Sequence, residues 1–292
     1  MDRGLSMKGI LITLLVGFSI NCTGLLACDM SGETGIAEEN NLWIGPDQKT
    51  ASTIDQATFN TIIDDVSKFY GPVISNLGGQ LKVNRLWSNG TVNAYAQRRG
   101  RYYEVSMFGG LARHDQATPD AFALVLCHEL GHHLGGIPQK SAISWASSEG
   151  QSDYFGTLKC LRMYMEGHDN IKIVSRMKIN AKVKTLCDKQ FTDKNDAAIC
   201  MRSSMAGKAL ASVLAAISRK NFPNFNSPDR NVVKKHDDKH PHPQCRLDTY
   251  FAGAVCDADK DMDVSDSDIN EGVCSRSWGD TEGVRPKCWF KP

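Results

Sequence analysis

The chain has 292 residues, of which 41% are hydrophobic and 23% charged, and this apolar content is enough for one large or two small globular cores. Its formal net charge of +1 gives neither the basic excess of a nucleic-acid-binding protein nor an acidic excess for a cationic partner. We therefore expect a globular protein with no nucleic-acid partner.

The N-terminal 27 residues have the features of a secretion signal. Arg3 and Lys8 precede the apolar run 9–20, and small residues follow before Cys28. The segment 25–28 is similar to a bacterial lipobox, which predicts lipidation of Cys28 and attachment to the membrane through that lipid. Ordinary cleavage and a retained membrane segment are the alternatives. We expect an exported protein, in the periplasm or at the outer membrane.

The next part of the chain alternates between polar, helical and β-rich patterns. Residues 28–50 are polar and rich in small side chains, which predicts a tether. Three β-rich runs separated by turn residues predict a small antiparallel or mixed sheet, with 101–108 as its exposed edge. The expected elements are a helix at 53–70, strands at 79–87, 91–99 and 101–108, helices at 117–136, 142–165, 172–187 and 195–218, and a surface loop at 220–243.

The helix expected at 117–136 contains a metal-binding pattern. Thr118 and Pro119 favour its start. His128 and His132 are four residues apart, so on a helix their imidazoles point to the same side and can share one metal ion. Glu129 lies beside them, where it can take a proton from an attacking water molecule. The pattern is typical of a peptidase that uses Zn²⁺ as its cofactor.

A catalytic zinc ion needs a third protein ligand. One class of zinc peptidase has a histidine six residues after the second motif histidine, but this chain has Pro138 there, and His133 points away from His132. Glu149 on the next predicted helix can complete the set instead. Asp153, one turn later, can accept a hydrogen bond from a ligand histidine and fix its tautomer.

These motifs resemble those of the gluzincin zinc metallopeptidases, in particular the CAAX prenyl endopeptidase and HtpX family and its BepA-like members. The resemblance covers residues 80–247, and Ser152 stands where that family usually has alanine. It implies an α+β fold, a mainly helical minigluzincin-like domain with a small sheet whose edge strand precedes the motif helix. It also implies that His240 acts at the metal, with Arg246 as its supporting cation. His242 is a rival of His240, and Tyr154 is another candidate for stabilising the oxyanion.

Cysteine content agrees with export. Outside the signal peptide and Cys28, the chain has enough cysteines for up to four disulfides, with a free buried thiol at Cys127 as the alternative. The eight are Cys127, Cys160, Cys187, Cys200, Cys245, Cys256, Cys274 and Cys288.

The sequence predicts four parts of the chain and one function. The parts are a signal peptide (1–27), a tether (28–50), a zinc metallopeptidase domain (51–243) and a cysteine-rich extension packed on that domain (244–292). The expected function is hydrolysis of extended or misfolded polypeptides in the bacterial cell envelope, with the substrate bound as an added β-strand. One alternative is a zinc-containing envelope chaperone or assembly lipoprotein that is non-catalytic or latent, with His240 on the metal. Another alternative is a purely structural lipoprotein that is stabilised by disulfides.

Overall fold

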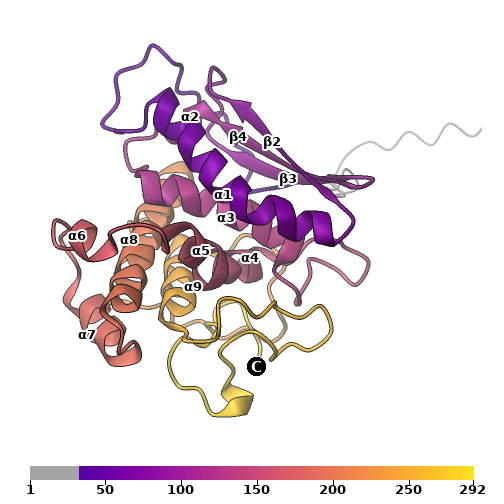
Figure 1. Cartoon of the computed structure of the whole chain (residues 1–292), viewed down its shortest axis with the longest axis vertical. Helices are drawn as coiled ribbons and strands as arrows, with labels where there is room; N and C mark the ends of the chain where they lie inside the picture. Colours follow the sequence, from indigo (N-terminus) through magenta and orange to yellow (C-terminus); the bar gives the residue numbers. More distant parts are fainter. Residues whose placement is uncertain (1–32) are drawn as a thin grey trace, which may run out of the picture. The chain divides into compact units, whose positions relative to one another are not determined.

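The computed structural model describes residues 33–292, so the predicted signal peptide and the lipidation site at Cys28 lie outside the described residues. The described part is α+β and mainly helical, as expected (Figure 1). Its sheet has the strand order β1-β3-β4-β2, in which β2 and β4 are parallel and the other pairs antiparallel. The strands are β1 (Glu33–Gly35), β2 (Gln80–Leu86), β3 (Ala94–Arg99) and β4 (Tyr102–Phe108).

Strand β4 is internal, so the prediction that residues 101–108 form an exposed edge is wrong. Val105 pairs with Ala96 on one side and with Val83 on the other. The turn at Gly100, where φ is +59°, explains the β3–β4 hairpin from local sequence. The parallel pairing of β2 with β4 is not local and has no turn signal. The edges of the sheet are β1 and β2.

Helix α3 lies between the sheet with α1 on one side and helices α4 and α8 on the other (Figure 1). Thr118 caps α3, its hydroxyl accepting from Ala121 N at 3.2 Å, and every side chain from Ala121 to His133 is buried. It is therefore a central core helix. The α-helices are α1 (Gln56–Asn76), α2 (Gly109–Ala112), α3 (Pro119–Leu134), α4 (Glu149–Phe155), α5 (Leu161–Met165), α6 (Asn170–Val174), α7 (Ala181–Gln190), α8 (Lys194–Ile217) and α9 (Pro243–Val255).

The helix expected at 142–165 begins only at Glu149. Residues before it form a loop in which Gln139 and Ser147 make an isolated β-bridge. From α4 the chain continues through one π-helical turn, η1 (Gly156–Cys160), into α5. A short 3₁₀ turn, η2 (Arg276–Trp278), lies in the C-terminal segment.

Four disulfides join the eight cysteines outside the N-terminal region, so the predicted disulfides are confirmed and the free thiol at Cys127 is not found. Such a number is typical of proteins that fold in an oxidising compartment. None of the helices formed by residues 33–292 combines the length and hydrophobicity of a bilayer span. The pairs are Cys127–Cys160, Cys187–Cys200, Cys245–Cys288 and Cys256–Cys274.

Two segments that lie outside the predicted peptidase domain pack together with it. The tether expected at 28–50 joins the sheet at β1, and Ile36 just after that strand is completely buried. The boundary expected at 243–244 falls at the start of α9, which packs against α8 and α4. Trp289 near the C-terminus is also completely buried. Both segments therefore contribute to the core, which the polarity of the predicted tether did not indicate for the N-terminal one.

Candidate metal centre

Three side chains from α3 and α4 converge in the core. The rings of His128 and His132 are 4.7 Å apart between centroids, as expected for neighbours one helical turn apart. Glu149, the first residue of α4, lies with its Oε2 atom 3.3 Å from His128 Nε2 and its Oε1 atom 3.6 Å from His132 Nε2. One ligand atom from each residue lies within 4.8 Å of the other two, so the three can share one ion.

These ligand atoms are buried, and none has a hydrogen-bond partner among residues 33–292. They are Nε2 of His128 and His132 and both carboxylate oxygens of Glu149. Burying an unpaired polar atom costs free energy, so such groups are rare in proteins and call for an explanation. Two imidazole nitrogens and a carboxylate are a common zinc ligand set, so these residues fit a zinc ion.

Hydrogen bonds at Nδ1 fix the tautomers of both histidines. His128 Nδ1 lies 2.7 Å from Asp153 Oδ1, and His132 Nδ1 lies 2.8 Å from the carbonyl oxygen of Ser147. A carboxylate and a carbonyl can only accept, so each neutral ring carries its proton on Nδ1 and leaves the Nε2 lone pair for a metal. Ser152, at the position where the similar family has alanine, places its hydroxyl 3.0 Å from His132 Nδ1.

Asp153 is held by Arg246 from α9. The Arg246 guanidinium donates to both Asp153 oxygens, each at 2.7 Å, in a bidentate pair that is almost completely buried. Arg246 Nη2 also lies 3.4 Å from His128 Nδ1. Burial opposes ionisation of Asp153, but the charges of Arg246 and His128 outweigh it and lower the Asp153 pKa.

His240 lies at the rim of the centre, with Nε2 3.4 Å from Glu149 Oε2. Its rival His242 is elsewhere: it caps α9, and its Nδ1 accepts from Gln244 N at 3.3 Å. Sequence reasoning missed Lys140, whose Nζ lies 3.3 Å from Glu149 Oε1. The available signal was that Lys140 is the one lysine or arginine between His132 and Glu149.

Burial and neighbouring charges shift the pKa values in the centre in different directions. Burial lowers the pKa of His128, but the Asp153 carboxylate overcomes this and raises it to about 9. For Glu129, burial dominates and raises the pKa to about 8. Burial would also raise the pKa of Glu149, yet the charges of His240 and His132 hold it well below its usual value. Glu129 and Glu149 are therefore electrostatically different carboxylates.

Two other residues weighed from the sequence lie away from the ligands. The Tyr154 hydroxyl donates to Gly283 O at 2.6 Å and accepts from Cys274 N at 3.3 Å, so Tyr154 is not placed to stabilise an oxyanion. His133 faces the sheet, with Nε2 3.2 Å from Glu104 O, and burial lowers its pKa to about 3.

Close packing of α3 on α4 brings the ligands together. A Cβ atom added at Gly131 would lie 2.9 Å from both Cα and O of Ser152. Glycine is thus required between the two motif histidines, because any side chain there would separate the helices. The Cys127–Cys160 disulfide joins α3 to η1 beside this contact.

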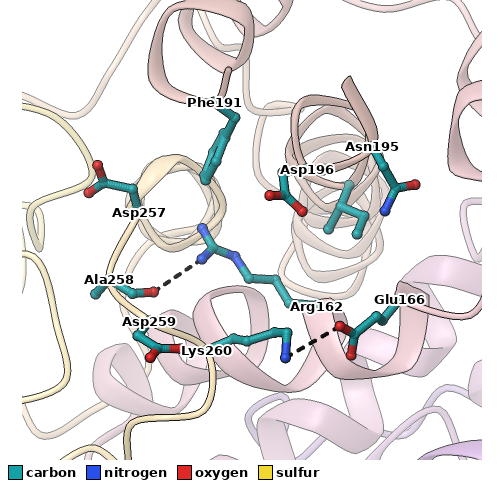
Figure 2. Close-up of a pocket in the computed structure, with 10 residues that line it drawn as sticks. Arg162, Glu166, Phe191, Asn195, Asp196, Asp257, Ala258, Asp259 and Lys260 are labelled. Carbon is teal, nitrogen blue, oxygen red and sulfur yellow. Dashed lines mark hydrogen bonds and ion pairs between the residues drawn. The ribbon is translucent and has the colours of Figure 1, made fainter. Parts of the chain in front are cut away.

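A different hollow, of about 300 Å³, shares no lining residue with this centre (Figure 2). Its two cationic side chains have partners: Arg162 Nη1 donates to Ala258 O at 3.3 Å, and Lys260 Nζ lies 3.4 Å from Glu166 Oε1.

Comparisons with known proteins do not assign the chain to a family: no protein-family model, no curated protein and no solved structure matches it.

Proposed function

We propose that the protein is a zinc-dependent endopeptidase of the bacterial cell envelope, attached to the membrane through a lipid on Cys28. His128, His132 and Glu149 would hold the zinc ion. The observation that carries the proposal is the buried Glu129 carboxylate, which has no hydrogen-bond partner among the described residues, next to a set of three side chains that can share one ion. A structural zinc site has four protein ligands, whereas a catalytic one has three and keeps a position for the reactants.

When bound, zinc would polarise the substrate carbonyl and make water a better nucleophile. Glu129 in its ionised form takes a proton from the attacking water and passes it to the leaving amine. His240 Nε2 donates a hydrogen bond to the carbonyl oxygen as it becomes negative. Asp153 and Arg246 keep the His128 ring oriented and its proton on Nδ1.

The latent alternative is favoured by one observation. His128, Glu129, His132 and Glu149 have no solvent-exposed surface, so the centre is closed in the described protein. A closed centre supports an enzyme that must open, or a zinc-containing chaperone that never cleaves.

Hydrolysis of unfolded casein by the purified protein tests the proposal, with Glu129→Gln as the decisive variant. We expect Glu129→Gln to keep its zinc and lose about 10²–10⁴-fold in rate, because the carboxamide cannot accept the proton. Glu166→Gln is the matched control, because Glu166 contacts Lys260 in the other hollow. Equal, measurable rates for wild type and Glu129→Gln would refute the mechanism, whereas no cleavage by either form would favour the latent alternative.

A further inference from the structure

Strand β1 occupies the edge of β3 as an added peptide would. It runs antiparallel to β3, with Gly35 opposite Tyr95, and Ile36 N donates to Ala94 O at 3.1 Å. One residue further, the Asn93 side chain bonds both backbone groups of Ala37: its Oδ1 accepts from Ala37 N at 3.2 Å, and its Nδ2 donates to Ala37 O at 3.1 Å. Main-chain contacts of this kind hold extended peptides at sheet edges.

Two consecutive carbonyls of this segment contact the residues around the metal ligands. Gly35 O accepts from His240 Nε2 at 2.8 Å, and Ile36 O accepts from Arg246 Nη1 at 2.5 Å. The same His240 nitrogen lies 3.4 Å from Glu149 Oε2. The Gly35 carbonyl therefore takes the hydrogen bond that our mechanism gives to a substrate carbonyl.

The segment is also packed into the interior of the protein. Ile36 has no exposed surface and Ala37 only 7%. Next to it a cavity of about 340 Å³ continues past His240, with Leu214, Ile217 and Pro241 among its lining residues. An extended chain longer than the segment could follow this cavity once the segment had moved.

We propose that residues Gly35–Asn40 lie in the peptide-binding position of the metal centre and keep the folded protein latent. The site then takes extended peptides with a small residue followed by an aliphatic one, as in Gly35-Ile36. Activation requires release of this segment from β3. The inference rests on the proposed function for its enzymatic part, but the occupancy of the position can be tested separately.

Two variants should release the segment without replacing any residue of the metal centre. In Gly35→Val, the new Cβ would lie 3.0 Å from Tyr95 Cε1 and 3.2 Å from Ala94 O, and the further methyl groups would crowd β3. Ile36→Ala removes the buried side chain and adds no clash. Gly45→Val is the matched control in the same part of the chain, because its Cβ would meet nothing closer than 3.7 Å.

Two measurements are made on each variant. The first is the Kd of a fluorescent peptide with the sequence of residues 33–40, ETGIAEEN, for the zinc-loaded protein that also carries Glu129→Gln. The second is casein hydrolysis with Glu129 intact. Zinc content and thermal unfolding verify that each variant is folded.

We expect Gly35→Val and Ile36→Ala to bind the peptide at least about tenfold more tightly than Gly45→Val, and to cleave casein at least about tenfold faster, since a released segment no longer competes. Unchanged peptide affinity in folded variants would overturn the inference, as would equal, rapid cleavage by all forms, which would still support the peptidase. Tighter peptide binding without cleavage by any form would support the occupancy and reject the peptidase. If Gly35→Val does not fold, Ile36→Ala decides.

Discussion

The metal centre and the hollow in Figure 2 both contain ionisable groups from distant parts of the chain. The two regions differ in whether these groups have hydrogen-bond partners. In the hollow, Arg162 and Lys260 have carbonyl and carboxylate partners. In the centre, Glu149 has ion-pair contacts with Lys140 and His240, but the Nε2 atoms of His128 and His132 have no hydrogen-bond partner among the described residues. Buried imidazole nitrogens without a hydrogen-bond partner are suited to bind a ligand, whereas the contacts of Arg162 and Lys260 in the hollow are explained by the protein alone.

Glu149→Ala should produce the largest effect of the variants compared, a loss of bound zinc that the matching variant in the hollow does not show. Removing the carboxylate leaves two ligands, so we expect bound zinc to fall from one equivalent to below about 0.1 after dialysis against a weak chelator. Zinc is measured by metal analysis of the dialysed protein. Glu166→Ala, on the hollow, should retain a full equivalent. Full zinc retention by Glu149→Ala would mean that the ligand set is wrong.

Arg246→Met should have the next largest effect, a loss of folding stability. It leaves the Asp153 carboxylate buried without its cation, so we expect the free energy of unfolding of the zinc-free protein to fall by about 3–5 kcal/mol. Arg162→Met should cost less, about 1–3 kcal/mol, because it leaves neutral carbonyls unpaired. Urea unfolding of both variants gives the comparison. A larger loss of unfolding free energy for Arg162→Met than for Arg246→Met would contradict this expectation.

Gly131→Ala should destabilise the protein by about 1–3 kcal/mol, because the added methyl group presses on the Ser152 backbone. It should also weaken zinc binding, because α3 and α4 carry different ligands. Gly167→Ala is the control beside the hollow, where a Cβ would meet nothing within 4 Å. Thermal unfolding and competition with a chromophoric chelator measure the two effects. Gly131→Ala with unchanged zinc affinity would show that this helix contact does not set the ligand geometry.

Lys260→Ala should have the smallest effect on zinc content and on folding stability. Its partner Glu166 is half exposed, and such surface ion pairs contribute roughly 0–1 kcal/mol. We expect no change in zinc content and a loss of stability below about 1 kcal/mol by urea unfolding. A loss of zinc in this variant would connect the two regions and remove the distinction between them.

The grouping of His128, His132 and Glu149 could be predicted because it depends on local geometry. Helical spacing places the two histidines on one side, and a short loop returns the chain to a second helix. The α+β class and the helix start at Thr118 also follow from local signals.

Features that depend on distant pairing could not be predicted. Nothing in 101–108 indicates that β2 pairs alongside it, so the local pattern predicts an edge strand where the protein has the internal strand β4. The short strand β1 lies in a polar, tether-like segment, and its place is fixed by contacts to Ala94, Asn93 and His240 far along the chain. Helical direction alone also could not show that Tyr154 would bond Gly283.

The positions of two disulfides have a consequence for the order of events during biogenesis. Cys127 immediately precedes the ligand His128, and Cys245 immediately precedes Arg246. Each bond therefore restrains the backbone of a residue at the centre. We expect the newly made chain in a reducing cytosol to bind zinc poorly, and metal loading to follow oxidation. Such timing would keep the proposed peptidase activity switched off until the protein had left the compartment in which it was synthesised.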